Sequence, residues 1–133
     1  MLVTFTLNPA IDHTVRVDGA LRIGGVYHSC AETWTPGGKG VNVAKMIAAN
    51  GHAVRASGLL GRDAIDFYRG FLDPLGVETG FLELGAATRE NTMLVGTDGR
   101  ELKVNRPGFP DCRPDWPALL AHCDDVCNSG DVV

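Results

Sequence analysis

The chain has 133 residues, of which 44% are hydrophobic and 21% charged, as in a folded globular protein rather than a disordered or membrane-embedded one. Its formal charge of -4 and its singly scattered Lys and Arg residues argue against a surface that follows a phosphate backbone, so we expect no nucleic-acid partner. The apolar start, residues 1–7, lacks a basic segment and is broken by an Asn-Pro pair. We therefore expect neither a signal peptide nor a membrane span, and a cytoplasmic location.

The four cysteines, Cys30, Cys112, Cys123 and Cys127, are too few and too unevenly spaced for a disulfide framework, so we expect reduced thiols. His122 lies beside two of them, and two thiols with an imidazole could ligate zinc. Their spacing matches no standard zinc motif, so we predict no metal site.

The first predicted elements are strands. Residues 2–7 form a short, mostly apolar run, as expected for a central strand that is buried on both faces. Residues 13–18 alternate apolar and polar side chains, and residues 26–34 do so more loosely, with a glycine pair at 24–25 between them. We predict that these two segments are half-exposed strands of a second, antiparallel sheet.

Two helices and two further strands are predicted next. The first helix covers residues 40–50 and is ended by a left-handed glycine, and a strand follows over residues 54–60. Asp63 is expected to cap the second helix, which Gly76 ends, before a strand over residues 77–84. The side chains expected to face the core are Val43, Ala44, Ile47 and Ala48 in the first helix and Ile65, Phe67, Phe71, Leu72 and Leu75 in the second.

The last part of the chain predicts a hairpin and a helix. Residues 92–95 and 101–104 flank an Asp-Gly turn, which is a strong signal for a hairpin that extends the second sheet. An Asp-Trp-Pro sequence at residues 115–117 opens a helix that runs through about residue 123. Residues 132–133 resemble the start of another buried strand.

The order of these elements predicts the fold class. Buried strands that alternate with helices indicate right-handed β-α-β units and a parallel sheet, while the half-exposed strands form a separate layer. The chain stops where such a sheet would normally continue. A frayed terminus is the alternative, but we expect residues 1–133 to be the N-terminal part of one domain.

Asp12 is the first candidate site residue. It follows the first predicted strand, so it should lie outside the carboxyl ends of the parallel strands, where open α/β folds bind ligands. A carboxylate there can accept two sugar hydroxyls. An Asp that only forms a turn after Pro9 is an equal alternative.

A glycine-rich segment at residues 36–42 leads directly into the first predicted helix. Gly37 and Gly38 bring bare backbone to the positive end of a helix, which suits hydroxyls or phosphate oxygens. Lys39 adds a mobile cation, and Asn42 offers a donor and an acceptor. The segment matches neither a Walker A loop nor a dinucleotide fingerprint. An ordinary flexible turn is the alternative.

Arg89 and Asn91 open a predicted strand in the sequence Thr-Arg-Glu-Asn at residues 88–91. The guanidinium of Arg89 could hold a phosphate bidentately. A surface arginine paired with the neighbouring Glu90 is the commoner use of such a residue.

Three segments in this order resemble the phosphofructokinase B family of ribokinase-like sugar kinases. They are Thr-Leu-Asn-Pro-Ala-Ile-Asp at residues 6–12, Pro-Gly-Gly-Lys-Gly-Val-Asn-Val-Ala at 36–44 and Thr-Arg-Glu-Asn at 88–91. The first two are most similar to the 1-phosphofructokinase and tagatose-6-phosphate kinase branch. The resemblance covers the whole chain. It implies a ribokinase-like doubly wound α/β fold with a small antiparallel β-sheet lid, here residues 13–35 and 91–105, and a homodimer formed through that lid.

The resemblance also implies a set of residues that hold the sugar, its phosphate or each other. They are Asp12, Gly37, Gly38 and Asn42 for the sugar, Lys39 and Arg89 near its phosphate, and Asn91 in support. The Gly-x-Gly-Asp motif that supplies the family's general base and adjoins its ATP site has no counterpart here. Asp131 follows a glycine, but the first glycine of the motif is missing, so we assign no catalytic residue.

The implied activity is ATP-dependent phosphorylation of a ketohexose phosphate, either fructose 1-phosphate to fructose 1,6-bisphosphate or tagatose 6-phosphate. ATP as co-substrate and Mg²⁺ belong to the complete enzyme, and neither is expected to bind this chain. Because the chain supplies only the acceptor side, we expect it to be inactive alone. One alternative is a non-catalytic sugar-phosphate-binding or dimerisation module. Another, a nucleotide-binding redox domain, rests only on the glycine-rich turn.

Overall fold

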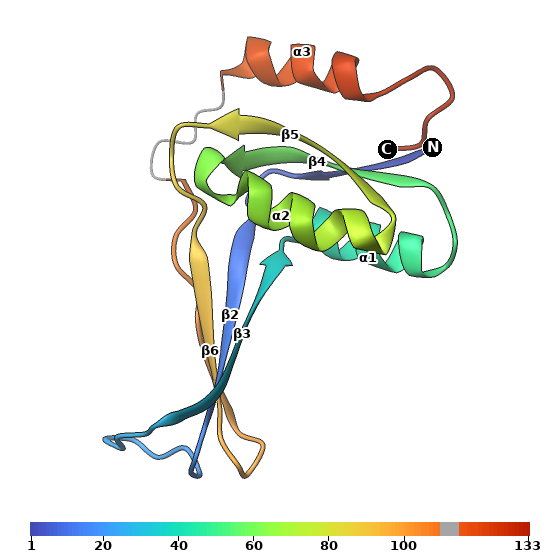
Figure 1. Cartoon of the computed structure of the whole chain (residues 1–133). Helices are drawn as coiled ribbons and strands as arrows, with labels where there is room; N and C mark the ends of the chain where they lie inside the picture. Colours follow the sequence, from blue (N-terminus) through green and yellow to red (C-terminus); the bar gives the residue numbers. More distant parts are fainter. Residues whose placement is uncertain (110–114) are drawn as a thin grey trace.

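The computed structural model describes residues 1–109 and 115–133 (Figure 1). A parallel sheet flanked by helices forms the body, and a long four-stranded sheet projects from it. The elements are β1 (Leu2–Thr6), β2 (Ala10–Val17), β3 (Ser29–Gly37), α1 (Lys39–Ala49), β4 (Val54–Gly61), η1 (Arg62–Ala64), α2 (Ile65–Leu72), η2 (Asp73–Leu75), β5 (Val77–Leu84), β6 (Glu90–Val95), β7 (Glu101–Val104) and α3 (Trp116–Val126).

The body sheet has the strand order β1-β4-β5, and all its pairs are parallel. Leu2 of β1 pairs with Val54 of β4, which in turn pairs with Val77 of β5. On its other side Leu2 forms a parallel bridge with Val132. Residue 132 therefore occupies a strand position beside β1, as predicted, but its side chain is 61% exposed and not buried as expected.

The helices lie on the two faces of this sheet. The connections β1-α1-β4 and β4-α2-β5 step across the sheet in one direction, whereas the return from β5 to Val132 steps back past β1. Since such crossovers are right-handed, α1 and α2 should cover one face and α3 the other. Figure 1 shows this arrangement. The strand order consequently reverses at β1.

The core lies between the body sheet and helices α1 and α2. Its residues are Val41, Ala44, Val54, Ala56, Leu60, Ala64, Tyr68, Leu72 and Val77. Tyr68 is the largest of them and is completely buried, although the hydrophobic pattern did not single it out. Burial of a tyrosine requires a hydrogen-bond partner for its hydroxyl.

Three side chains that were expected to face the core are instead partly exposed. Val43, Phe71 and Leu75 are 50%, 36% and 48% exposed. In α1 the buried residues are Val41 and Ala44, and Ile47 and Ala48 pack against the core as expected, so only Val43 lies off the expected face. After α2 the chain tightens into the 3₁₀ turn η2, whose period of three residues per turn moves Leu75 off the apolar face.

The second sheet has the order β3-β2-β6-β7 and is mixed, so the expectation that it is antiparallel is wrong. The pairs β2–β3 and β6–β7 are antiparallel, but β2 and β6 run parallel. The reason lies in the body: β2 follows β1 and β6 follows β5, and these two body strands point the same way. Only the hairpin partners β3 and β7 return. We call this the mixed sheet.

The predicted hairpin is confirmed. Thr92 pairs with Val104 and Val95 with Glu101, and Gly99 at the turn has a φ of 78°. The helix expected from residue 115 is also present as α3. The Asp115 side chain caps it by accepting a hydrogen bond from the backbone N–H of Ala118 at 3.5 Å.

Asp63 does not cap α2 as expected. That helix has no side-chain cap, and the Asp63 carboxylate instead accepts a hydrogen bond from the backbone N–H of Thr88 at 3.1 Å. The Thr88 hydroxyl in turn accepts one from the backbone N–H of Gly61 at 2.9 Å. Asp63 therefore fixes the segment before β6 against the end of β4.

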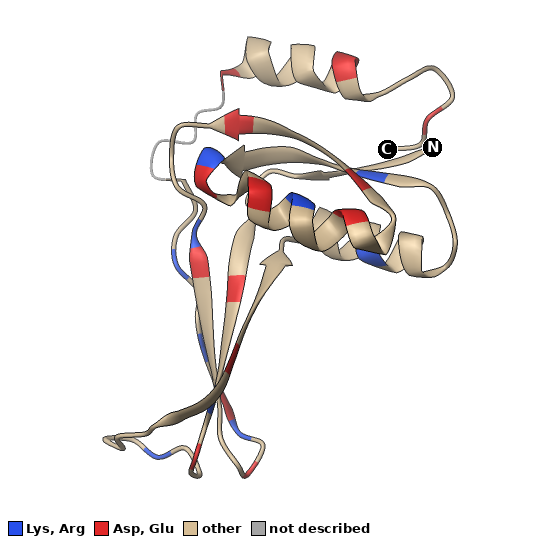
Figure 2. Cartoon of the chain, viewed as in Figure 1, with Lys and Arg blue, Asp and Glu red and all other residues tan. Residues whose placement is uncertain are grey.

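Acidic and basic residues are scattered over the body and the mixed sheet (Figure 2). Some pair across neighbouring strands, as Arg55 of β4 does with Glu78 of β5 at 2.8 Å. Within residues 1–109 and 115–133, no helix is long and apolar enough to cross a membrane.

Candidate sugar-phosphate site

The candidate site is a crevice at the carboxyl end of β1. This is where the strand order reverses, and open α/β sheets bind ligands at such a point. A cavity of about 390 Å³ opens there. Its walls come from the ends of β1, β2, α1 and β6: Phe5, Thr6, Leu7, Asn8, Ala10, Asp12, Gly38, Lys39, Gly40, Asn42, Arg89 and Asn91. Every site residue expected from the sequence lines this cavity except Gly37, which lies directly behind Asp12.

Asp12 and Asn91 form the pair that connects the two central strands of the mixed sheet. They are register partners on β2 and β6, and Asn91 Nδ2 donates a hydrogen bond to Asp12 Oδ1 at 3.0 Å. Asn91 Oδ1 is buried and, within the part of the chain that the structure describes, has no hydrogen-bond partner. The pair thus fixes the Asp12 carboxylate at the wall of the crevice, where its oxygens can accept hydrogen bonds from hydroxyls.

The loop between β3 and α1 needs glycine at two positions for different reasons. At Gly37 a β-carbon would lie 2.8 Å from Asp12 Cγ, so no side chain fits beside that carboxylate. At Gly38 the backbone φ is 118°, a conformation that residues with a side chain rarely adopt. The two glycines therefore allow the loop to pass close to Asp12 and turn directly into the helix.

The amino end of α1 is held by Thr6, whose role is not predictable from its place in the sequence. The Thr6 hydroxyl is buried and accepts a hydrogen bond from the backbone N–H of Val41 at 3.0 Å. Lys39 and Asn42 follow on the first turn and line the crevice. With the positive end of a helix and one ammonium group, this part of the wall suits anionic or hydroxyl oxygens.

Lys45, one turn further along α1, was also missed. Its ammonium group donates a hydrogen bond to the carbonyl oxygen of Pro36 at 3.0 Å. Burial lowers the pKa of Lys45 below its ordinary value, and the charge of Asp12 partly opposes this shift. The sequence does not indicate which backbone carbonyl a lysine will contact, so this hydrogen bond to the loop could be found only from the fold.

Arg89 lines the crevice but uses several of its donors on backbone carbonyls. It donates to the carbonyl oxygens of Pro9 at 3.2 Å, Arg106 at 3.0 Å and Asn8 at 3.4 Å. Of the five guanidinium N–H groups, two are left for a ligand. The alternative pairing with Glu90 is not seen in the described contacts, since that carboxylate lies near Arg106 and His13.

A second cavity of about 670 Å³ continues the crevice along the mixed sheet. It shares Asp12, Lys39, Asn42 and Asn91 with the first. Its further lining residues are His13, Thr14, Thr35, Thr92, Met93, Lys103 and Asn105. Alternation along the mixed-sheet strands could have placed several of these on the Asp12 face, but only once the register between the strands was known.

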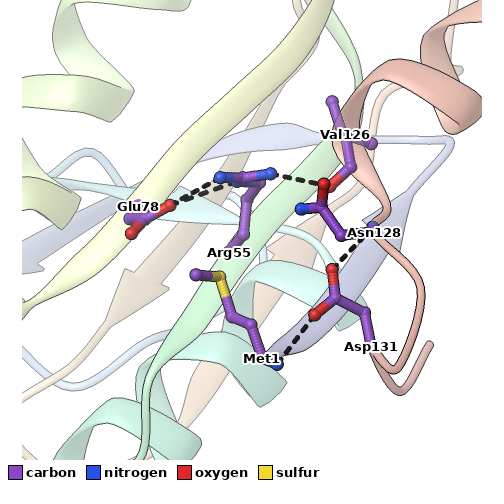
Figure 3. A network of polar contacts seen from close by, with 6 residues as sticks. All are labelled: Met1, Arg55, Glu78, Val126, Asn128 and Asp131. Atoms are coloured by element: carbon purple, nitrogen blue, oxygen red, sulfur yellow. Dashed lines mark hydrogen bonds and ion pairs between the residues drawn. The ribbon is translucent and has the colours of Figure 1, made fainter.

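Asp131 lies at the opposite end of β1 from the crevice. Its Oδ1 is 2.7 Å from the amino group of Met1, and its Oδ2 accepts a hydrogen bond from the backbone N–H of Asn128 at 2.8 Å (Figure 3). Nearby, Arg55 donates to the carbonyl oxygen of Val126 at 2.7 Å. These contacts fasten the segment after α3 to the body sheet.

The cysteine cluster near the end of the chain gives no metal centre among the described residues, which contain no group of three or more suitable ligands. The Nε2 atom of His122 is 3.0 Å from both Ser57 Oγ and the carbonyl oxygen of Gly80, so this nitrogen is engaged with the body sheet. Cys112 lies outside the described residues.

A parallel sheet with a ligand-sized crevice at the carboxyl ends of its strands is typical of ligand-binding α/β domains. Residues 6–123 match the pfkB family of carbohydrate kinases. The match spans most of the chain, which therefore belongs to the pfkB family. The predicted doubly wound α/β fold of this family is confirmed.

The chain is also similar to two 1-phosphofructokinases and to one phosphofructokinase of known structure. The 1-phosphofructokinase of Haloferax volcanii is 43% identical over 108 residues, which cover 81% of this chain and 35% of that protein. The 1-phosphofructokinase of Bacillus subtilis is 33% identical over 133 residues, covering 100% of this chain and 43% of that protein. The phosphofructokinase-2 of Escherichia coli, solved in complex with fructose-6-phosphate, has the same fold, with a TM-score of 0.84 at 24% identity over 98% of this chain and 43% of its own. The chain spans less than half the length of these relatives.

Proposed function

We propose that this chain carries the acceptor-sugar half of an ATP-dependent ketohexose-phosphate kinase of the 1-phosphofructokinase type. The observation that carries the proposal is the crevice at the end of β1, where a carboxylate, a glycine-rich helix start and two cationic side chains surround one cavity. The names of the two curated relatives support the choice of reaction.

In the proposed complex the Asp12 carboxylate accepts hydrogen bonds from two sugar hydroxyls. Asn42 and the backbone around Gly37 and Gly38 bind further hydroxyls, and Asn91 holds Asp12 in place. The acceptor is fructose 1-phosphate, which would become fructose 1,6-bisphosphate, or tagatose 6-phosphate.

The phosphate of the acceptor sugar lies near Lys39 and Arg89 in this proposal. Lys39 contributes a mobile ammonium group at the start of α1. Arg89 contributes its two remaining N–H groups, while its contacts with backbone carbonyls fix the guanidinium at the wall.

The proposed reaction transfers the γ-phosphoryl group of ATP, with Mg²⁺ neutralising the phosphate charge. The described residues do not fit a Mg²⁺ site, because the first cavity presents the single carboxylate of Asp12, which already accepts a hydrogen bond. We assign ATP, Mg²⁺ and the base to the region that the longer relatives possess and this chain does not span. We expect the chain to be inactive alone, and the use of ATP by the complete enzyme suggests a cytoplasmic protein.

We further propose that the mixed sheet is a lid formed by residues 13–35 and 91–105, and that its outer face forms a homodimer. The register places Trp34, Leu102 and Val104 on the face opposite Asp12, where they are 45%, 54% and 54% exposed. A second copy of this face would bury these side chains.

Thermal unfolding of the purified chain tests the proposal. We expect millimolar fructose 1-phosphate or tagatose 6-phosphate to raise the unfolding midpoint and ATP with Mg²⁺ to leave it unchanged, since only a ligand that binds the folded state stabilises it. No shift with either sugar phosphate, or a shift with ATP alone, contradicts the proposal.

The second candidate is a non-catalytic sugar-phosphate-binding or dimerisation module, which the exposed side chains Trp34, Leu102 and Val104 on the outer face of the mixed sheet favour. A mixing experiment distinguishes the two candidate functions. The purified chain is combined with the part of the Bacillus subtilis relative that follows the aligned region, and ATP-dependent turnover of fructose 1-phosphate is measured. Turnover that needs both polypeptides supports a kinase half, whereas binding without turnover in the mixture supports a binding module.

A further inference from the structure

Tyr68 of α2 connects the buried core to the edge of the crevice. Its side chain is completely buried, and its ring makes edge contacts with Phe67 and Phe81, with centroid separations of 6.1 and 5.6 Å. Its hydroxyl lies 2.7 Å from the carbonyl oxygen of Ala10 and 2.9 Å from that of Gly37. A hydroxyl has one proton, so both carbonyls share a single donor.

These two carbonyls mark the root of the mixed sheet. Ala10 begins β2 and Gly37 ends β3, and the two residues are register partners. Asp12 follows two residues later on β2, and Gly37 packs directly against its carboxylate. The loop that leads into α1 also starts at Gly37. One hydroxyl from the body therefore reaches the point where the mixed sheet and the glycine loop meet.

The chemistry of this hydroxyl suits a permanent donor. Burial raises the pKa of Tyr68 well above its ordinary value, and the two carbonyl contacts oppose this only in part. The phenol therefore stays protonated at neutral pH. Its removal would take a donor from two carbonyl oxygens at a buried position, and such groups are costly to leave unpaired.

We propose that Tyr68 is a positioning residue, whose hydroxyl sets the Asp12 carboxylate and the Gly37 backbone relative to the start of α1. It acts through the carbonyls of Ala10 and Gly37 without touching the ligand. The identity of that ligand rests on the proposed function, but the positioning itself does not.

Tyr68→Phe separates this role from simple core packing, because it keeps the ring and removes only the oxygen. Two properties are measured: backbone hydrogen exchange at residues 10–13, 34, 35 and 37, and the affinity for fructose 1-phosphate by calorimetry. We expect exchange at these residues to become about tenfold faster and the dissociation constant to rise about tenfold, as for one hydrogen bond.

Phe81→Leu is the matched control, since it changes the packing around the ring but keeps the hydroxyl. We expect it to lower the unfolding midpoint at least as much as Tyr68→Phe, while the dissociation constant stays within twofold of the original. The proposal is overturned if Tyr68→Phe leaves exchange at the sheet root unchanged, or if both variants weaken binding equally.

The measurements distinguish a failure of the proposed function from a failure of the role given to Tyr68. If the unaltered chain binds no sugar phosphate, the proposed function fails, and the exchange rates still decide the role of Tyr68. If Tyr68→Phe does not fold, NMR of the unaltered chain decides: we expect the Tyr68 hydroxyl proton to exchange with water far more slowly than that of the half-buried Tyr27. Equal rates contradict the shared hydrogen bond.

Discussion

Asn91 Nδ2 lies 3.0 Å from Asp12 Oδ1, joining two parallel strands at residues 79 positions apart in the chain. The hydrogen bond fixes the orientation of the carboxylate that we assign to the sugar hydroxyls. Hydrogen bonds to charged groups contribute about 1.5–3 kcal/mol, and each 1.4 kcal/mol corresponds to about a tenfold change in affinity.

Replacing this amide should weaken sugar-phosphate binding. Asn91→Leu keeps a similar volume and removes the donor to Asp12, so we expect the dissociation constant of fructose 1-phosphate to rise about tenfold, as measured by calorimetry. Asn50→Leu, at the exposed carboxyl end of α1, is the control and should leave the affinity within twofold. Equal affinities for Asn91→Leu and the original chain would contradict the role given to this pair.

A side chain at Gly37 should be far more damaging than one at a glycine without close neighbours. Its β-carbon would lie 2.8 Å from Asp12 Cγ and 3.0 Å from the carbonyl oxygen of Ala10. For Gly37→Ala we expect a loss of about 1–3 kcal/mol in unfolding free energy, from urea denaturation, together with loss of sugar-phosphate binding.

Gly70→Ala is the matched control for this substitution. Gly70 lies within α2, and a β-carbon there meets no atom within 4 Å. Because alanine is favoured over glycine in a helix, we expect a gain of about 0.5–1 kcal/mol in unfolding free energy. If Gly37→Ala proves as stable as Gly70→Ala and binds normally, the close approach of the loop to Asp12 is refuted.

Much of the fold could be predicted from local sequence patterns. The β6–β7 hairpin followed from its Asp-Gly turn, α3 from Asp115, and the body strands from short apolar runs. Asp12 was placed at the carboxyl ends of the parallel strands by its distance from β1 alone. In these cases the residues that specify the feature are neighbours in the chain.

The features that were missed depend on distant partners. The parallel pairing of β2 with β6 is set by the directions of β1 and β5, which lie outside both strands. Asp63 has the position of a helix cap, yet it binds the backbone of Thr88, 25 residues away. Tyr68 and Lys45 contact backbone carbonyls. Every residue has such a carbonyl, so the sequence does not indicate which one a side chain will contact.

Acid should weaken the fold partly through Asp131. Its hydrogen bonds with the amino group of Met1 and the backbone N–H of Asn128 lower the pKa of this carboxyl below its ordinary value. A carboxyl with a lowered pKa in the folded state stabilises that state at neutral pH. This contribution is lost as the pH falls below about 4, through the folded pKa.

Thermal unfolding at pH 7 and pH 3 checks this expectation. The midpoint of Asp131→Asn should fall less between the two pH values than that of the original chain. Asp66→Asn is the control, because the Asp66 side chain is fully exposed, and it should keep the original pH dependence. Identical pH dependence in Asp131→Asn and the original chain would show that the ion pair with Met1 does not contribute.

The proposed dimer predicts opposite results for two adjacent residues of β7. Leu102→Asp places a charge on the outer face of the mixed sheet, so we expect sedimentation to show monomers. Lys103→Asp changes the charge on the inner face, where Lys103 lines the second cavity, and should leave the dimer intact. A chain that is monomeric before any substitution, or a dimer that survives Leu102→Asp, rules out this interface.

The bridge between Leu2 and Val132 also has a consequence for biosynthesis. β1 leaves the ribosome before its partner at residue 132, which follows Leu2 by 130 residues. The Met1–Asp131 contact holds this partner in place once both have been made. At about 5–20 residues per second, the edge of β1 that this partner covers stays open for roughly 6–26 s. Unpaired strand edges can recruit other chains, so the pace of translation, and not only the stability of the finished fold, should determine how much nascent polypeptide escapes aggregation.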